Sequence, residues 1–172
     1  MANDDEPLKR LNDLSSEEAS REFLKCCGSK RWAETMAQRC PYLTEAELTR
    51  AANDIWWSLE QSDWLEAFRS HPKIGEKKAA EAVSTQSQQW SGQEQSGMRN
   101  AAHETVDSLA QLNRDYEAKF GFIYIVCATG KSADEMLANL RERLQNEAAD
   151  ELPIAAAEQA KITELRLKKL IN

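Results

Sequence analysis

Residues 44–59 read TEAELTRAANDIWWSL, and this stretch decides the fold class. Its apolar side chains recur at the three- and four-residue spacing that places them on one face of a helix. At its start, Thr44 and Glu47 have the spacing of a capping box, in which a hydroxyl and a carboxylate satisfy the free amides of the first turn. The stretch therefore predicts an amphipathic helix.

Similar signals continue on both sides of this stretch. Ser15 with Glu18 and Ser132 with Glu135 are further capping-box pairs, each followed by apolar residues at helical spacing. Other helices are expected around 32–36, from Ser62 or Asp63 as the cap to residue 70, at 76–83, at 87–119, and from near 153 to the C-terminus. Gly92 and Gly97 weaken the first part of the helix at 87–119, so an irregular start is expected there.

Residues 122–128 form the only strand-like run in the chain. A single strand has no partner for its backbone hydrogen bonds, so we expect a buried extended or helical segment there instead. The chain is therefore predicted to be an all-α protein with a single compact domain of about eight helices and no significant sheet. Residues 1–14 are expected to be a loose N-terminal segment, and residues 15–172 the helical domain.

Composition narrows the possible partners. The chain has 172 residues, 41% hydrophobic and 30% charged, which fits one globular domain with a buried core. Its formal net charge of -7 argues against a nucleic-acid partner, which would require a basic face. No apolar run has membrane-spanning length, and the polar start does not resemble a signal peptide. We therefore expect a cytoplasmic protein without nucleic-acid or membrane contacts.

The cysteines do not predict a metal site. Cys26, Cys27, Cys40 and Cys127 form no CxxC pair, and the histidines do not complete a zinc spacing. The expectation is four reduced, partly buried thiols and no bound metal.

Three groups of polar residues are candidates for chemistry. His71 ends an expected helix and is followed by Pro72, so a stiff turn could hold its ring in one orientation for proton transfer. The alternative is a histidine that only ends a helix and interacts with the helix dipole. Ser91 and Glu94, three residues apart, could address one ligand together or could simply cap a helix.

Arg166 is the third candidate. It follows Ile162 by four residues on the last expected helix, so it lies on an apolar stripe. An arginine in this position either extends its charged end to solvent or pairs with a buried anion. Spacing alone does not decide between these alternatives.

Several segments in fixed order resemble one protein family, the decarboxylases of 2-oxo-4-hydroxy-4-carboxy-5-ureidoimidazoline (OHCU). The resemblance covers about residues 15–171, and its most specific parts are the His-Pro-x-Ile-Gly and Lys-Phe-Gly-Phe elements. The matching segments are DWLEAF at 63–68, SHPKIG at 70–75, SGQEQSG at 91–97, YEAKFGFIY at 116–124, TGKS at 129–132 and ITELRL at 162–167.

The resemblance implies an all-α enzyme that needs no metal or organic cofactor and is usually a homodimer. It implies catalytic roles for His71 and Glu94 in converting OHCU to (S)-allantoin during uric acid degradation. Some relatives are fused to a hydroxyisourate hydrolase, so a functional association with that enzyme is also expected. The substrate-binding residues that it implies are Pro72, Ser91, Phe122, Ile123, Tyr124 and Arg166.

Two other functions compete with this expectation. A different small-anion lyase or isomerase could use the same histidine, glutamate and arginine, and a panel of substrates would separate it from an OHCU decarboxylase. A helical protein-interaction module that has kept the decarboxylase fold would bind a protein partner and would tolerate loss of His71.

Overall fold

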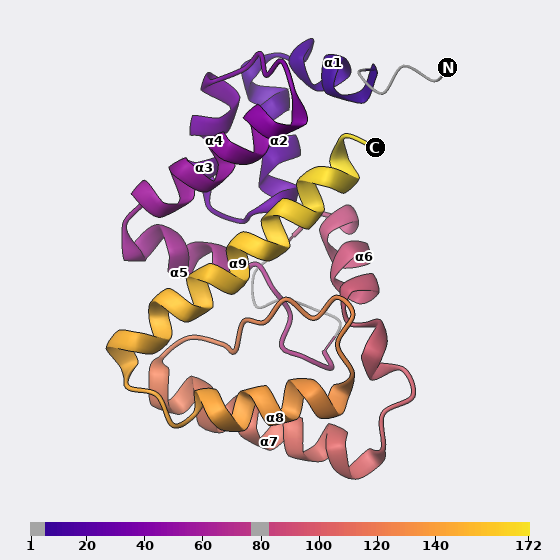
Figure 1. Cartoon of the computed structure of the whole chain (residues 1–172), viewed down its shortest axis with the longest axis vertical. Coiled ribbons are helices and arrows are strands. Elements are labelled where there is room, and N and C mark those ends of the chain that lie inside the picture. Colours follow the sequence, from indigo (N-terminus) through magenta and orange to yellow (C-terminus); the bar gives the residue numbers. More distant parts are fainter. Residues whose placement is uncertain (1–5, 77–82) are drawn as a thin grey trace. The chain divides into compact units, whose positions relative to one another are not determined.

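The computed structural model describes residues 6–76 and 83–172. This part of the chain contains nine α-helices, one short 3-10 helix and no strand, so the all-α prediction is confirmed (Figure 1). The helices are α1 (Glu6–Asn12), α2 (Ser16–Cys26), α3 (Lys30–Gln38), α4 (Glu45–Ser58), α5 (Gln61–Arg69), α6 (Thr85–Glu94), η1 (Ser96–Met98), α7 (His103–Phe120), α8 (Ala133–Arg143) and α9 (Ala148–Leu170).

Backbone contacts divide the chain into two compact units. The first unit contains the chain up to Ala67 together with Ala160–Asn172, and the second contains Phe68–Gln159. Helix α9 contributes residues to both units. No helix among residues 6–76 and 83–172 combines the length and the apolar character needed to cross a lipid bilayer.

The first unit is built around a buried aromatic cluster. The rings of Phe23 and Trp32 meet edge to face with centroids 6.0 Å apart, and Tyr42 contacts Phe23 in the same way at 6.3 Å. The indole Nε1 of Trp32 donates a hydrogen bond of 3.0 Å to the carbonyl of Ala52, which ties α3 to α4. Edge-to-face geometry and a satisfied indole both stabilise such a core.

Most of the expected helix starts in this unit are confirmed, with two differences. The full capping box at Ser15 and Glu18 is present. Thr44 accepts from the amide of Glu47, but the Glu47 carboxylate accepts from the amide of Leu43, so the second box is only half formed. The other difference is in α5, which begins at Gln61, so the expected cap at Ser62 or Asp63 is wrong. The Asp63 carboxylate instead reaches back to the amide of Glu60.

The N-terminal segment is more ordered than expected. Residues 6–12 form α1, which buries Leu8 and Leu11, because these two leucines lie three apart and share one helical face. The prediction of a loose segment is therefore wrong for residues 6–12.

Two neighbouring thiols of the first unit should make the free energy of unfolding decrease at alkaline pH. All four cysteines are free, and burial raises the pKa of Cys27 from its ordinary value of 9.0 to about 12, and that of Cys26 as well. A buried thiol stays neutral in the folded state while the unfolded thiol ionises, so the free energy of unfolding is fully retained below pH 9 and falls above it.

We expect each of the two thiols to lower the free energy of unfolding by about 1 kcal/mol at pH 10 relative to pH 7. Urea unfolding at both pH values measures this change. The Cys27→Ala variant should lose part of the pH dependence, and an unchanged dependence would contradict the assignment to this thiol.

In the second unit, α7 and α8 lie side by side, and residues 123–128 pass them as an extended segment without forming a strand, followed by a turn at 129–130 (Figure 1). Of the two alternatives expected for residues 122–128, a buried extended or a buried helical segment, the structure shows the first: no helix forms at 123–128, and residues 124–128 are buried. The full capping box at Ser132 and Glu135 starts α8, as predicted. The unit's core cluster includes Leu109, Tyr116, Val126, Met136 and Leu140.

The long helix expected at 87–119 is broken in the structure. It is replaced by α6, the 3-10 helix η1 and α7. The break coincides with Gly97, where an added Cβ would lie 2.1 Å from the carbonyl oxygen of Lys131. The chain can pass that carbonyl so closely only with a glycine, and a tertiary contact thus overrides the local helical pattern.

Two glycines of this region should respond in opposite ways to alanine. Gly97→Ala should destabilise the protein by about 1–3 kcal/mol, because backbone must move to relieve the overlap. Gly92 lies inside α6 with no atom within 4 Å of an added Cβ, so Gly92→Ala should stabilise by roughly 0.5–1 kcal/mol. Urea unfolding of both variants measures this, and equal effects would contradict the close approach at Gly97.

The remaining expectations concern two helices. The helix expected at 76–83 lies mostly outside the described residues. The last helix begins at Ala148, so Pro153 lies inside α9 rather than at its start. The missing proline amide leaves one backbone carbonyl of the preceding turn without its usual helical donor.

Candidate active site

The His71 turn is fixed at both ends within the second unit. Helix α5 ends at Arg69, and Pro72 disfavours helical backbone at the histidine before it. Gly75 has a φ of +89°, and its amide donates a hydrogen bond of 2.9 Å to the Gln95 side chain at the end of α6. Lys73 forms an ion pair of 2.7 Å with Glu117 of α7. The turn is thus anchored to two helices.

The imidazole of His71 is buried and held by a side chain from α9. Its exposed fraction is 7%, and its Nε2 lies 2.7 Å from Oε1 of Gln159, which is fully buried. A histidine that only ended a helix at the surface would be exposed and would not require a buried hydrogen-bonding partner. The structure therefore favours the interpretation of an oriented histidine over that of a simple helix end.

Ser91 and Glu94 are buried in the last turns of α6 and do not cap it. The helix begins at Thr85, and its cap is Ser84, whose hydroxyl accepts from the amide of Ser87. The capping alternative for Ser91 and Glu94 is therefore wrong. Their exposed fractions are 5% and 8%, so α6 holds a hydroxyl and a carboxylate away from bulk water.

The extended segment brings one of its sides close to Glu94. Successive side chains of an extended chain point to opposite sides. Tyr124 and Val126 belong to the core cluster with α7 and α8, so Ile125 and Cys127 lie on the other side. Burial raises the pKa of the Cys127 thiol, and the carboxylates of Glu158 and Glu94 raise it further. Glu94 is therefore within electrostatic reach of the segment.

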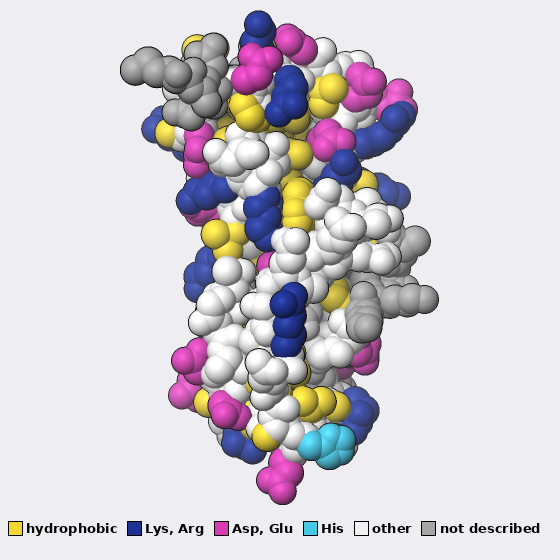
Figure 2. Space-filling view, turned by 90° about the vertical axis from the view of Figure 1, so that its right-hand side faces the viewer, with side chains coloured by type: hydrophobic (Ala, Val, Ile, Leu, Met, Phe, Trp, Pro, Cys, Tyr) yellow, Lys and Arg dark blue, Asp and Glu magenta, His cyan; other side chains and the backbone are white. Residues whose placement is uncertain are grey.

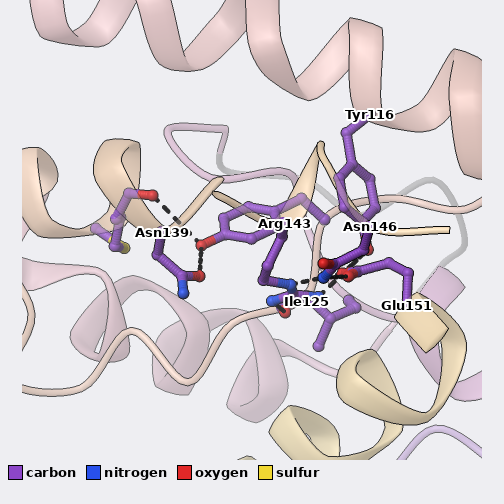
Figure 3. A network of polar contacts seen from close by, with 8 residues as sticks. Tyr116, Ile125, Asn139, Arg143, Asn146 and Glu151 are labelled. Carbon is purple, nitrogen blue, oxygen red and sulfur yellow. Dashed lines mark hydrogen bonds and ion pairs between the residues drawn. The ribbon is translucent and has the colours of Figure 1, made fainter. Parts of the chain in front are cut away.

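A buried polar network holds this segment in place (Figure 3). The Arg143 guanidinium forms an ion pair of 2.5 Å with Glu151 and donates to the backbone carbonyl of Ile125 at 2.5 Å. Tyr116 donates to the same Glu151 carboxylate at 2.5 Å, and Asn146 donates to its other oxygen at 2.9 Å. Ionised and hydrogen-bonded groups that satisfy one another in this way define a single backbone position.

The side chain of Tyr124 is part of this interior arrangement. Its ring packs under the guanidinium of Arg143 at 4.8 Å, and its hydroxyl donates to Asn139 of α8 at 2.5 Å. Burial raises the pKa of Tyr124 and of Tyr116, so both hydroxyls stay protonated as donors. Phe122 is half-buried and contacts Phe68 with ring centroids 5.5 Å apart.

Arg166 belongs to the first unit and is buried, with 3% of its surface exposed. Its Nη1 donates a hydrogen bond of 3.2 Å to the carbonyl of Lys25. The alternative in which its charged end extends to solvent is therefore wrong.

The described residues contain no group of histidine, cysteine, aspartate or glutamate side chains that could hold a metal ion. The face drawn in Figure 2 carries both basic and acidic side chains.

Fold and site together define an all-helical protein that buries an oriented histidine and a carboxylate in the same compact unit as a fixed extended segment. A family model described as OHCU decarboxylase matches residues 12–168. The chain therefore belongs to the OHCU decarboxylase family, whose members are carboxy-lyases.

The chain is similar to curated proteins of uric acid degradation. It is 39% identical over 160 residues to the uric acid degradation bifunctional protein TTL of Arabidopsis thaliana, covering 92% of this chain and 49% of that protein. It thus spans about half of that relative. It is 29% identical to the 2-oxo-4-hydroxy-4-carboxy-5-ureidoimidazoline decarboxylase of Xenopus laevis, covering 93% of this chain and 91% of the relative.

Solved structures share the fold. A crystal structure of an OHCU decarboxylase in the presence of (S)-allantoin has a TM-score of 0.76 and 40% identity, covering 88% of this chain and 97% of that one. A crystal structure of an (S)-allantoin synthase has a TM-score of 0.70 at 19% identity, and this likeness concerns the fold alone.

Sequence reasoning missed two residues of the site, Gln159 and Gln95. Both are amides that hold the His71 turn, one at the ring and one at Gly75. No sequence signal links either glutamine to His71, because Gln159 lies 88 residues further along the chain.

Proposed function

We propose that this protein decarboxylates OHCU to (S)-allantoin in uric acid degradation. The observation that carries the proposal is the buried His71 imidazole, held by Gln159 in the same compact unit as the buried Glu94 carboxylate. Family membership supplies the substrate, and the site supplies groups that can hold it and transfer a proton.

The reaction needs an acceptor for the electron pair of the breaking bond. In OHCU the ring C=N beside the carboxylated carbon can accept that pair, so the substrate carries its own electron sink. The carbon–carbon bond to the carboxylate breaks, CO₂ leaves, and a proton is then added to a ring carbon. The protein must hold the carboxylate out of the ring plane, so that the breaking bond overlaps the π system.

His71 and Glu94 are proposed to hydrogen-bond the hydroxyl and ureido groups and to manage the proton. Delivery of the proton to one face by one of these groups would give the (S) product. Ser91 would orient Glu94 or the substrate. Arg166 would bind an anionic or carbonyl part of the substrate through its planar fork of donors.

The remaining substrate contacts are proposed for the chain beside these groups. Pro72 lies next to the histidine, and Phe122, Ile123 and Tyr124 begin the extended segment. Because the Tyr124 hydroxyl is occupied by Asn139, its contribution would come through the backbone. Apolar walls would favour loss of the charged carboxylate over its retention.

The assembly and cellular context remain proposals as well. We propose a homodimer in the cytoplasm that acts without cofactor. Its unstable substrate would come from a hydroxyisourate hydrolase, and the name of the Arabidopsis relative describes two functions in one protein. The two proteins would therefore be expected to work close together.

A circular-dichroism time course tests the proposed reaction. OHCU is generated in situ from urate with urate oxidase and hydroxyisourate hydrolase, and this protein is then added. The expected result is rapid appearance of the (S)-allantoin signal. Slow formation of racemic allantoin at the rate of the enzyme-free control would contradict the proposal and favour the interaction-module alternative.

A further inference from the structure

We infer that Gln159 is a positioning residue that fixes His71 in the tautomer with the proton on Nε2 and leaves Nδ1 as the basic nitrogen. The inference rests on the proposed function and assigns a role within it. The observation is the 2.7 Å contact between His71 Nε2 and Gln159 Oε1.

The chemistry of the two groups sets the direction of this hydrogen bond. A carboxamide oxygen can only accept, so a short contact from it to a ring nitrogen requires a proton on that nitrogen. Neutral imidazole carries one proton, which places it on Nε2 and a lone pair on Nδ1. A reacting proton would therefore be exchanged at Nδ1.

The position of Gln159 suits a fixed orienting group. Its exposed fraction is 0%, and it lies in the interior of α9, more than two helical turns from either end. Its amide is therefore held by the surrounding packing before any substrate binds. The other end of the turn is held by Gln95, so the ring and its backbone are fixed by two separate amides.

The Gln159 side chain is uncharged, and this affects how readily the His71 ring is protonated. A carboxylate at this position would stabilise the imidazolium, as an opposite charge favours the charged form. An amide orients the ring with no full charge beside it. Gln159 thus selects the Nε2–H tautomer of the neutral ring, and it stabilises the protonated ring less than a glutamate would.

The chain makes a direct measurement possible because it has only two histidines. The second, His103, is exposed, with 92% of its side-chain surface accessible. In the His103→Asn variant, ¹⁵N-labelled at histidine, long-range ¹H–¹⁵N correlation spectra report the tautomer of His71 alone. They are recorded at a pH high enough for the ring to be neutral.

The expected spectrum is that of the Nε2–H tautomer with Gln159 present. In Gln159→Leu the tautomer distribution should shift toward Nδ1–H, and kcat for OHCU should fall about 10²-fold with a smaller change in KM. Gln159→Glu keeps an acceptor and should keep the Nε2–H tautomer. Gln111→Leu, on the exposed face of α7, is the matched control and should change neither quantity.

An Nδ1–H tautomer with Gln159 in place would overturn the inference, and this spectrum requires no variant of Gln159 to fold. An unchanged tautomer and kcat in a folded Gln159→Leu variant would overturn it as well. If the Nε2–H tautomer is found but the protein forms no (S)-allantoin, the proposed reaction fails while the assignment of the tautomer stands.

Discussion

Replacing His71 by alanine should lower the rate of (S)-allantoin formation by about 10² to 10⁴-fold, the range that a general acid–base group supplies. The ring is buried and held by Gln159, so the substitution removes the group that is proposed to transfer the proton. Glu94→Ala should cause a loss of similar size. The measurement is the circular-dichroism time course with each variant, at saturating and at low substrate concentration.

The control for this prediction is the other histidine. His103 is exposed on α7 and lies 3.6 Å from Asp107 one turn further on, so His103→Ala should keep full activity. Far-ultraviolet circular dichroism and urea unfolding establish that each variant is folded. Full activity in a folded His71→Ala or Glu94→Ala variant would remove that residue from the catalytic machinery.

Helix positions were predictable from the sequence wherever local signals decide them. The hydroxyl–carboxylate pairs at Ser15 and Ser132 cap their helices as expected, because the pair itself satisfies the first free amides. The glycines at 92 and 97 predict an irregular start of the long helix, but the contact that sets the break at Gly97 was not predictable, since it involves the carbonyl of Lys131, 34 residues further along the chain. Local propensity does not report such a contact.

The candidate site shows the same limit. His71 can be chosen from the sequence because Pro72 and Gly75, which shape its turn, follow it closely in the chain. Gln159 cannot, because only the fold brings α9 to the imidazole. Arg143 and Glu151 lie near helix ends, where charged residues are common and usually exposed. The sequence therefore does not indicate that both are buried.

The buried ion pair of Arg143 and Glu151 should have a large effect on stability. Their side chains are 6% and 0% exposed, so removing one partner leaves an uncompensated charge in the interior. Arg143→Met or Glu151→Leu should each lower the free energy of unfolding by about 3–5 kcal/mol. The double variant should be much less destabilised than the two single effects added together, since no lone charge remains.

Urea unfolding of the two single variants and the double variant measures this coupling. The control is the exposed pair of Lys168 and Glu164, 45% and 48% accessible, where Lys168→Met should cost less than about 1 kcal/mol. Equal effects for the buried and exposed pairs would contradict the prediction.

The same variants separate stability from the position of the extended segment. Arg143 donates to the carbonyl of Ile125, so its loss frees the backbone between the predicted substrate contacts and Cys127. Amide hydrogen exchange at residues 122–128 should then increase more than in Glu151→Leu, where the arginine can still reach that carbonyl. The rate of (S)-allantoin formation is compared under conditions where both variants are folded. A larger fall in Arg143→Met than in Glu151→Leu would show that the guanidinium places the segment for activity, in addition to stabilising the fold.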